Sequence, residues 1–392
     1  MFATAVIYTI LWLSFYVVLK ERESAFNRLG NKCSTSFWTI GLILVLMLAC
    51  LIKGLSYDMG ADYLEYVNIF KRISRSSFHS RGELEFGYFF LNKILAFFQL
   101  NLPWIFIVNS FIVFYSLLYL ASQLKYNMAI SVVLWIFFLY IMSNNIWRQY
   151  DAMGFMMIAF TKLVQADVSD EKKFIAKKLL GFTIFSGIAY LFHKTAVIYF
   201  VVFLLLWIIR KKHFNVFIIL GAITITFIYT AIFVQNSNMT ALATAMELMG
   251  YSDTYTLSNK FEEYTKFSVL SETKEYLVHV FTILAGDYIL RKNKKNYKYR
   301  LLYYVVVFYF ILYPFGRFHS LFVRLIMYAQ MLIPFYYGLT LYYLKKEQKQ
   351  SLLAKMYKVA IYFMIFLFFV DFYQYIASST ESIGHGYMLY KF

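Results

Sequence analysis

Apolar stretches of roughly membrane-spanning length recur along the whole chain and are separated by short polar or charged loops. Because a transmembrane helix needs about 20 mostly apolar residues, each stretch predicts a span. Twelve spans are predicted, several of them short and closely connected: 2–19, 37–55, 103–121, 128–147, 149–166, 179–193, 194–209, 215–235, 275–290, 301–316, 325–344 and 358–376. We therefore expect an all-α polytopic integral membrane protein, with residues 1–392 forming a single transmembrane domain.

A further apolar stretch, 84–100, carries Lys93 and is followed by Asn101 and Pro103. A charge inside so short a stretch favours a helix that lies in the membrane interface or re-enters from one side. We expect such a helix near 84–100 rather than a thirteenth span.

The composition excludes a water-soluble globule. Of the 392 residues, 61% are hydrophobic and 15% are charged, whereas an average soluble domain has about 45–50% apolar and about 25% charged residues. The formal net charge of +17 would suggest nucleic acid as a partner of a soluble protein. In a membrane protein the placement of the charges matters more, and we expect membrane lipid and no nucleic acid as a partner.

Lysine and arginine are distributed unequally between the two sets of loops. One set holds 23 of these residues and the opposite set holds 13. The positive-inside rule makes the richer set cytoplasmic, so both termini are predicted to face outward. Two longer segments, 56–83 and 236–274, then form external loops, and the second is expected to act as a lid over a groove for sugar. Chemistry is therefore expected on the outer face.

The first external segment combines carboxylates with phenols. If it is helical from Asp58, then Asp58, Asp62 and Tyr66 share one face, because residues three and four apart are neighbours. Carboxylates accept protons from hydroxyl groups, and aromatic rings pack on the apolar faces of sugars. This combination fits a saccharide site or a general base, although a solvated amphipathic helix would show the same pattern.

Cationic side chains mark the predicted outer ends of several spans. Arg148 lies between two spans, and His193 with Lys194 occupies a hairpin with almost no connecting loop. Arg317 and Arg324 are seven residues apart, which would place both on one side of a continuous helix, with His319 off that face. Such groups can bind phosphate, but they can equally snorkel to the headgroups.

Several chemistries lack their sequence motifs. The chain has no glycine-rich phosphate loop, no H-E-x-x-H, no G-x-S-x-G and no paired-cysteine metal motif. ATP-driven transport and zinc proteolysis are therefore poorly supported. Asp58 and Asp62 are too weak a signal to predict a metal site.

The order of short motifs relative to the spans resembles the EpsG-like family of bacterial exopolysaccharide and O-antigen polymerases, the Wzy type. The motifs are Gly60-x-Asp62-Tyr63-x-x-Tyr66, Glu85-Phe86-Gly87-Tyr88, Ile146-Trp147-Arg148-Gln149, Ala189-x-x-x-His193-Lys194-x-Ala196 and a late Arg324 followed by Tyr328. Trp147 and Asp151 depart from the family's pattern, in which small residues follow the Arg-Gln pair.

The resemblance implies a glycosyltransferase with a fold similar to the GT-C type, acting on the outer face of the bacterial inner membrane. It would polymerise oligosaccharide repeat units carried on undecaprenyl diphosphate, without a metal or other cofactor. It also implies a chain-length regulator and a flippase as partners. The expected site residues are Asp62, Glu85, Arg148 and His193 for catalysis, Arg148, His193, Lys194, Arg317 and Arg324 for the diphosphate, and Asp58, Asp62, Tyr63, Tyr66, Glu85 and His319 for sugar.

Three alternatives stay open at this stage. A flippase or other polysaccharide transporter would also have many spans, but transporters commonly show repeated halves and charges at mid-membrane, and neither is evident in the sequence. An O-antigen ligase would use related chemistry. A membrane O-acyltransferase should carry a histidine within a span, whereas His193 and His319 are predicted at the outer boundary.

Overall fold

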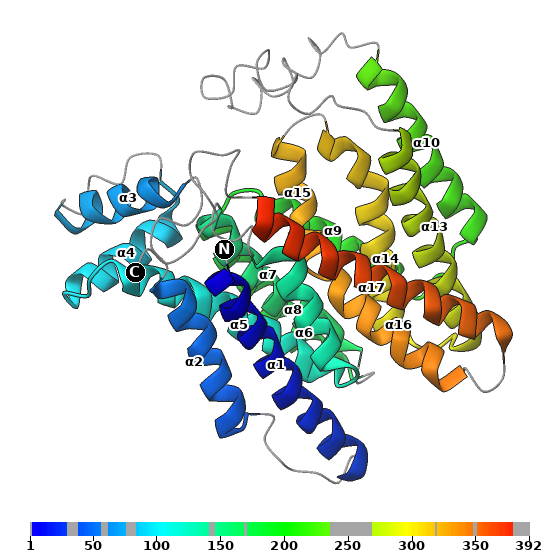
Figure 1. Ribbon diagram of the computed structural model, residues 1–392, viewed down its shortest axis with the longest axis horizontal. Helices are drawn as coiled ribbons and strands as arrows, with labels where there is room; N and C mark the ends of the chain where they lie inside the picture. Colours follow the sequence, from blue (N-terminus) through cyan, green and yellow to red (C-terminus); the bar gives the residue numbers. More distant parts are fainter. Residues whose placement is uncertain are drawn as a thin grey trace. The chain divides into compact units, whose positions relative to one another are not determined.

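The computed structural model describes residues 2–29, 38–55, 62–75, 84–140, 146–167, 171–235, 269–317, 320–347 and 351–378. Every regular element in these ranges is a helix (Figure 1). Five helical segments are long and apolar enough to cross a membrane: Pro103–Leu124, Lys172–Phe192, Tyr297–Gly316, Phe322–Glu347 and Leu352–Gln374. The prediction of an all-helical membrane protein is confirmed at this level, and the count of twelve spans and the GT-C-like fold remain predictions.

The chain divides into two compact units, Met1–Ile208 with Pro334–Phe392 and Ile209–Ile333. This division leaves the prediction of a single transmembrane domain untested. The helices of the first unit are α1 (Phe2–Leu29), α2 (Ile40–Gly54), α3 (Tyr63–Arg75), α4 (Phe86–Phe97), α5 (Pro103–Leu124), α6 (Met128–Leu139), α7 (Trp147–Ala166), α8 (Lys172–Phe192), α9 (Ala196–Ile209), α16 (Ile333–Glu347) and α17 (Leu352–Ser378). Those of the second unit are α10 (Val216–Gln235), α13 (Val269–Lys292), α14 (Tyr297–Leu312), the 3-10 helix η3 (Tyr313–Arg317) and α15 (Ser320–Gln330).

Local sequence signals explain where several helices begin. Thr39 caps α2 by accepting a hydrogen bond from the Leu42 amide at 3.3 Å, which satisfies a donor that a helix start leaves unpaired. Pro103 opens α5, where its missing N–H costs nothing. Asn296 caps α14 through the Tyr299 amide. The apolar runs are thus bounded by residues that start helices.

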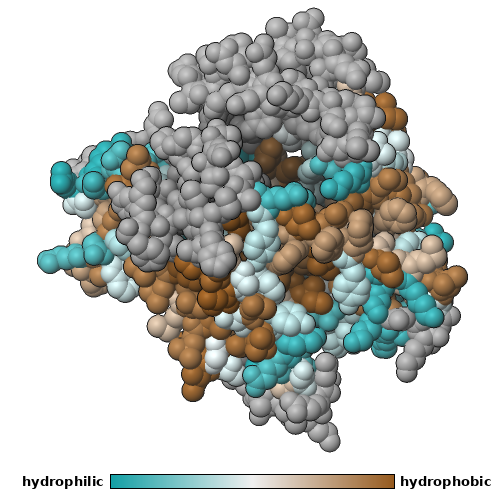
Figure 2. All heavy atoms as spheres, viewed as in Figure 1, coloured by the Kyte–Doolittle hydropathy of each residue, from teal (hydrophilic) through white to brown (hydrophobic). Residues whose placement is uncertain are grey.

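Helix α7 is the core of the first unit, because most of its side chains are buried against α5 and α8. Gly154 permits close approach to α5, since a Cβ there would lie 3.1 Å from Ile112 Cγ2. Other helices expose large apolar side chains such as Ile184, Phe217 and Val359. Figure 2 shows apolar side chains over much of the visible surface. Water would not tolerate so much exposed apolar area, so lipid is the expected solvent.

Some predicted boundaries differ from the observed ones. The predicted span 128–147 is not one helix, because α6 ends at Leu139 and Trp147 already belongs to α7. The span 325–344 is divided by a turn at Met331 and Leu332, shortly before Pro334. The break before Pro334 is expected because proline interrupts helices, whereas no proline lies near the end of α6.

The two external segments also differ in detail from the predictions. Segment 56–83 contains α3 (Tyr63–Arg75), and Asp58 lies outside the described residues. Segment 236–274 overlaps the start of α13 at Val269. The proposed lid otherwise lies outside the described residues. Helix α4 has 12 residues, about 18 Å at 1.5 Å per residue, so it is too short to span and fits the expected interfacial or re-entrant helix in length.

Candidate functional site

Four helix ends meet at one end of the first unit: the starts of α3, α4 and α7 and the end of α8. Arg148 in the first turn of α7 binds Glu85, which precedes α4. Tyr66 of α3 accepts a hydrogen bond from the same guanidinium. The end of α8 packs on Gly87 of α4, where an added Cβ would lie 2.9 Å from the Leu191 carbonyl oxygen. Predicted site residues from separate parts of the sequence are therefore brought together.

Arg148 and Glu85 form the central ion pair of this cluster. The Arg148 Nη1 to Glu85 Oε2 distance is 2.5 Å, and the two side chains are 30% and 12% exposed. The pair is thus sheltered but still reachable. A guanidinium has five N–H donors, so Arg148 retains donors for a further anionic group while it holds Glu85 and Tyr66.

Tyr66 supports the guanidinium from within the protein. Its side chain is buried, and burial raises the pKa of the Tyr66 phenol above its usual range, although the Arg148 charge acts in the opposite direction. Tyr66 is therefore a neutral hydroxyl at physiological pH. Tyr63 is also buried and stacks on Phe106, with ring centroids 5.4 Å apart. Both tyrosines were predicted to face sugar, and that role stays a prediction.

A second polar layer lies behind the ion pair. The Tyr88 ring packs edge-on to Tyr66, with centroids 5.9 Å apart, and its hydroxyl lies against the Asn109 amide. With its nitrogen facing inward, that amide donates to Asp151 Oδ2 at 3.1 Å. Asp151 is fully buried, and its Oδ1 has no hydrogen-bond partner among the described residues. The departure from the family pattern at Asp151 thus corresponds to a buried carboxyl close to the site.

His193 and Lys194 form the tight connection between α8 and α9. The His193 amide donates to the Ala189 carbonyl at 3.0 Å, and its Nδ1 is 2.6 Å from the Thr195 hydroxyl. The imidazole is therefore oriented by its own turn. Lys194 is exposed. Since α8 packs on α4, His193 follows directly on the helix end that adjoins Glu85.

Lys53 is a residue of this region that the sequence analysis missed. Its side chain is buried, and Nζ donates to the Tyr140 carbonyl at 2.8 Å while lying 4.1 Å from the Tyr140 ring centroid. The Trp147 ring centroid is 5.3 Å away. Lys53 therefore joins the end of α2 to the end of α6, beside the start of α7. A lone lysine in an apolar run was the signal that could have found it.

The remaining predicted residues lie elsewhere. Arg317 ends η3 and Arg324 belongs to α15, both in the second unit. They belong to two elements whose connecting residues, 318 and 319, lie outside the described ranges, so the prediction that both face one side stays a prediction. Asp58 and His319 lie outside the described residues. Within the described ranges, no three His, Cys, Asp or Glu side chains gather as a metal site would require, and a reaction without metal remains a prediction.

Comparisons with known proteins agree with the resemblance in the motifs. The family model described as EpsG family matches residues 38–392, which include all four helix ends of the site. No curated protein and no solved structure matched the chain. Because the match covers well over half of the sequence, the chain belongs to the EpsG family.

Proposed function

We propose that the protein is a polysaccharide polymerase that joins oligosaccharide repeat units carried on undecaprenyl diphosphate at the outer face of the bacterial inner membrane. Membership of the EpsG family indicates a polysaccharide-polymerase-like membrane protein. The observation that supports the finer proposal is the pairing of Arg148 with Glu85 at the meeting point of four helix ends. In the proposal, the guanidinium would serve the leaving diphosphate and the carboxylate would serve the attacking hydroxyl.

The proposed reaction is one glycosyl transfer. A hydroxyl oxygen of the acceptor sugar attacks the anomeric carbon of the donor chain, and the bond between that carbon and the phosphate oxygen breaks. The electron pair leaves with the lipid diphosphate, and the hydroxyl proton passes to a carboxylate. No external energy source is needed, because the donor is already activated by its diphosphate.

Arg148 would act on the leaving group. Negative charge develops on the departing diphosphate, so a guanidinium placed beside it stabilises the transition state more than the ground state. A diphosphate oxygen would compete with Glu85 for the Arg148 N–H groups, and binding would loosen the ion pair. Lys194, at the exposed turn, and the arginines Arg317 and Arg324 of the second unit are proposed as further diphosphate ligands.

Glu85 and Asp62 are the candidate general bases. Glu85 is bound to Arg148, and its release by the incoming diphosphate would leave a carboxylate ready to accept a proton. Asp62 precedes α3 and lies near Tyr66. Glu85→Gln and Asp62→Asn preserve size, so the variant that loses transfer but still binds substrate identifies the base.

The test uses the purified full chain in liposomes with its lipid-diphosphate-linked repeat unit and no nucleotide. Products with a ladder spaced by one repeat unit would support the polymerase. Movement of the lipid-linked unit across the liposome membrane without any ladder would instead assign the protein to the transporters. Failure of both would overturn the proposal.

A further inference from the structure

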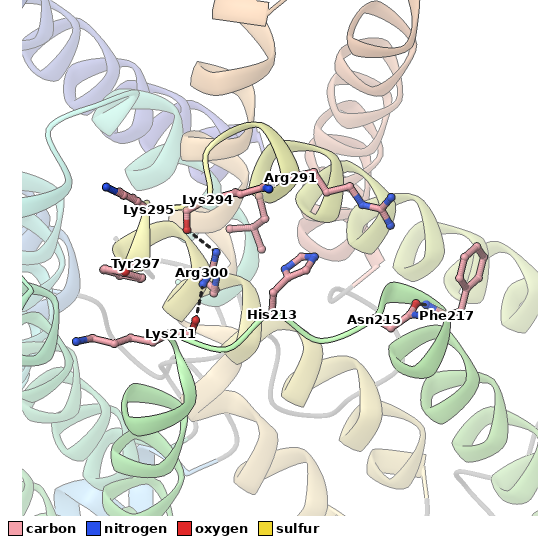
Figure 3. A pocket seen from close by; sticks show the side chains of 10 residues that line it. Lys211, His213, Asn215, Phe217, Arg291, Lys294, Lys295, Tyr297 and Arg300 are labelled. Carbon is pink, nitrogen blue, oxygen red and sulfur yellow. Dashed lines mark hydrogen bonds between the residues drawn. The ribbon is translucent and has the colours of Figure 1, made fainter.

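A basic cavity lies within the second unit, and none of the residues proposed for polymerisation lines it. Its volume is about 910 Å³, and it lies between the segment that leads into α10 and the turn that joins α13 to α14 (Figure 3). The basic side chains at its wall are Lys211, His213, Arg291, Lys294, Lys295 and Arg300. The loop charges predict that both segments face the cytoplasm.

Arg300 holds the two walls of the cavity together. Its Nη1 donates to the Arg210 and Lys211 carbonyls at 3.3 and 3.1 Å, and its Nη2 donates to the Lys294 carbonyl at 2.6 Å. Figure 3 shows Arg300 between the backbone of the two loops. The side chain is 4% exposed, and Nε has no hydrogen-bond partner among the described residues. The cavity is thus fixed by a buried cation with an unused donor.

The positive charge of the cavity is only partly balanced. Asp287 of α13 binds Arg291, with Nε to Oδ2 at 2.7 Å, and its Oδ1 is 3.5 Å from His213 Nε2. Lys211, Lys294 and Lys295 form no ion pair within the described ranges. Three ammonium groups around one cavity create a positive potential that would concentrate an anion.

We propose that this cavity binds the phosphate group of an anionic ligand. Ammonium groups act as point charges toward phosphate, and a buried arginine adds donors in fixed directions. The volume exceeds what one phosphate needs and falls in the range of about 300–1,000 Å³ that is usual for small-molecule sites. Tyr297 and Phe217 add aromatic surface at the wall. The phosphate belongs either to a lipid headgroup or to a soluble phosphate compound.

Loop charges that only orient the protein in the membrane would not require a buried arginine that links two loops around a cavity. The positive-inside effect depends on the number of lysines and arginines near the membrane. Arg300, in contrast, is buried and hydrogen-bonded to the backbone of two loops. The cavity therefore predicts saturable binding at one place, and diffuse surface charge predicts a weak effect shared by all exposed lysines.

The experiment measures binding of short-chain phosphatidylglycerol, short-chain phosphatidylcholine and inorganic phosphate to the purified full chain in uncharged detergent. The test variant is Lys294→Gln with Lys295→Gln, and the matched control is Lys172→Gln with Lys173→Gln at the start of α8. Each pair is adjacent, exposed and on a predicted cytoplasmic loop, so folding should be unaffected in both.

We expect saturable phosphatidylglycerol or phosphate binding by the wild type, weakened about tenfold or more in the cavity variant and less than about twofold in the control. Binding of phosphatidylglycerol alone would identify a lipid headgroup, and binding of inorganic phosphate as well would identify a soluble ligand. Equal weakening in both double variants, or no saturable binding of either anion, would overturn the proposal.

Discussion

The sharpest prediction about the site concerns the close packing of α8 on Gly87. Gly87 lies in the first turn of α4, and the end of α8 packs directly on its Cα. A Cβ at this position would be 2.7 Å from Phe192 Cδ2 and 2.9 Å from the Leu191 carbonyl oxygen. Ordinary contacts between carbon atoms are about 3.5–4.0 Å. Relieving the contact with Phe192 Cδ2 would therefore require the end of α8 to move by about 0.8–1.3 Å in Gly87→Ala.

The cost to stability follows from two opposing effects. Overpacking costs about 1–3 kcal/mol, and replacing glycine by alanine in a helix returns up to about 1 kcal/mol. We expect a net loss of about 0–2 kcal/mol. The cost to activity should be larger, because His193 follows directly on the displaced helix end and a misplacement of about 1 Å can lower a rate about 10²-fold.

The matched control is Gly187→Ala in α8, where no atom lies within 4 Å of an added Cβ. This variant should be as stable as the wild type or slightly more stable, with unchanged activity. The assay compares thermal unfolding and the rate of chain extension for both variants. If Gly87→Ala behaved like Gly187→Ala in both measurements, the packing that we describe between α4 and α8 would be refuted.

Three further substitutions test neighbouring parts of the site. Tyr66→Phe should lower the extension rate several-fold with a stability loss of about 1 kcal/mol, because one acceptor for Arg148 is lost; chain-length gels and melting curves would show both effects. Asp151→Asn should stay folded, whereas Asp151→Leu leaves a buried amide unpaired and should cost about 1–3 kcal/mol, as thermal unfolding would reveal. Thr195→Val should slow extension, because the Thr195 hydroxyl no longer contacts His193 Nδ1, and Thr195→Ser should retain the wild-type rate. Equal rates for all three proteins would contradict the proposed orientation of the imidazole.

The sequence predicted the class of fold and part of the site because both depend on local patterns. Apolar run length predicts membrane helices, and Glu85, Arg148 and His193 lie at the predicted outer ends of those runs. The structure brings the segments of all three together at one end of the first unit. Order along the chain and position relative to the predicted spans singled out these segments, and the roles of the three residues stay predictions.

The missed features depend on contacts between distant segments. The apolar run does not show that α6 stops at Leu139, since Tyr140, Ile141 and Met142 continue it before the first polar residue, Ser143. Lys53 reads as an isolated charge until the Tyr140 carbonyl is placed beside it. The sequence also does not show that Arg317 belongs to the 3-10 helix η3 and Arg324 to α15. These features depend on how distant segments pack, which a local sequence pattern does not reveal.

The central claim is that Arg148 stabilises the departing lipid diphosphate. The most direct measurement is the rate of a single glycosyl transfer to an acceptor, compared between the wild type, Arg148→Lys, Arg148→Ala and Arg72→Ala. Arg72 is an exposed residue of α3 and serves as the control. We expect Arg148→Ala to be about 10²–10³-fold slower, Arg148→Lys to be intermediate because it keeps the charge but loses the fork of donors, and Arg72→Ala to match the wild type. A rate for Arg148→Ala within about twofold of the wild type would contradict the account.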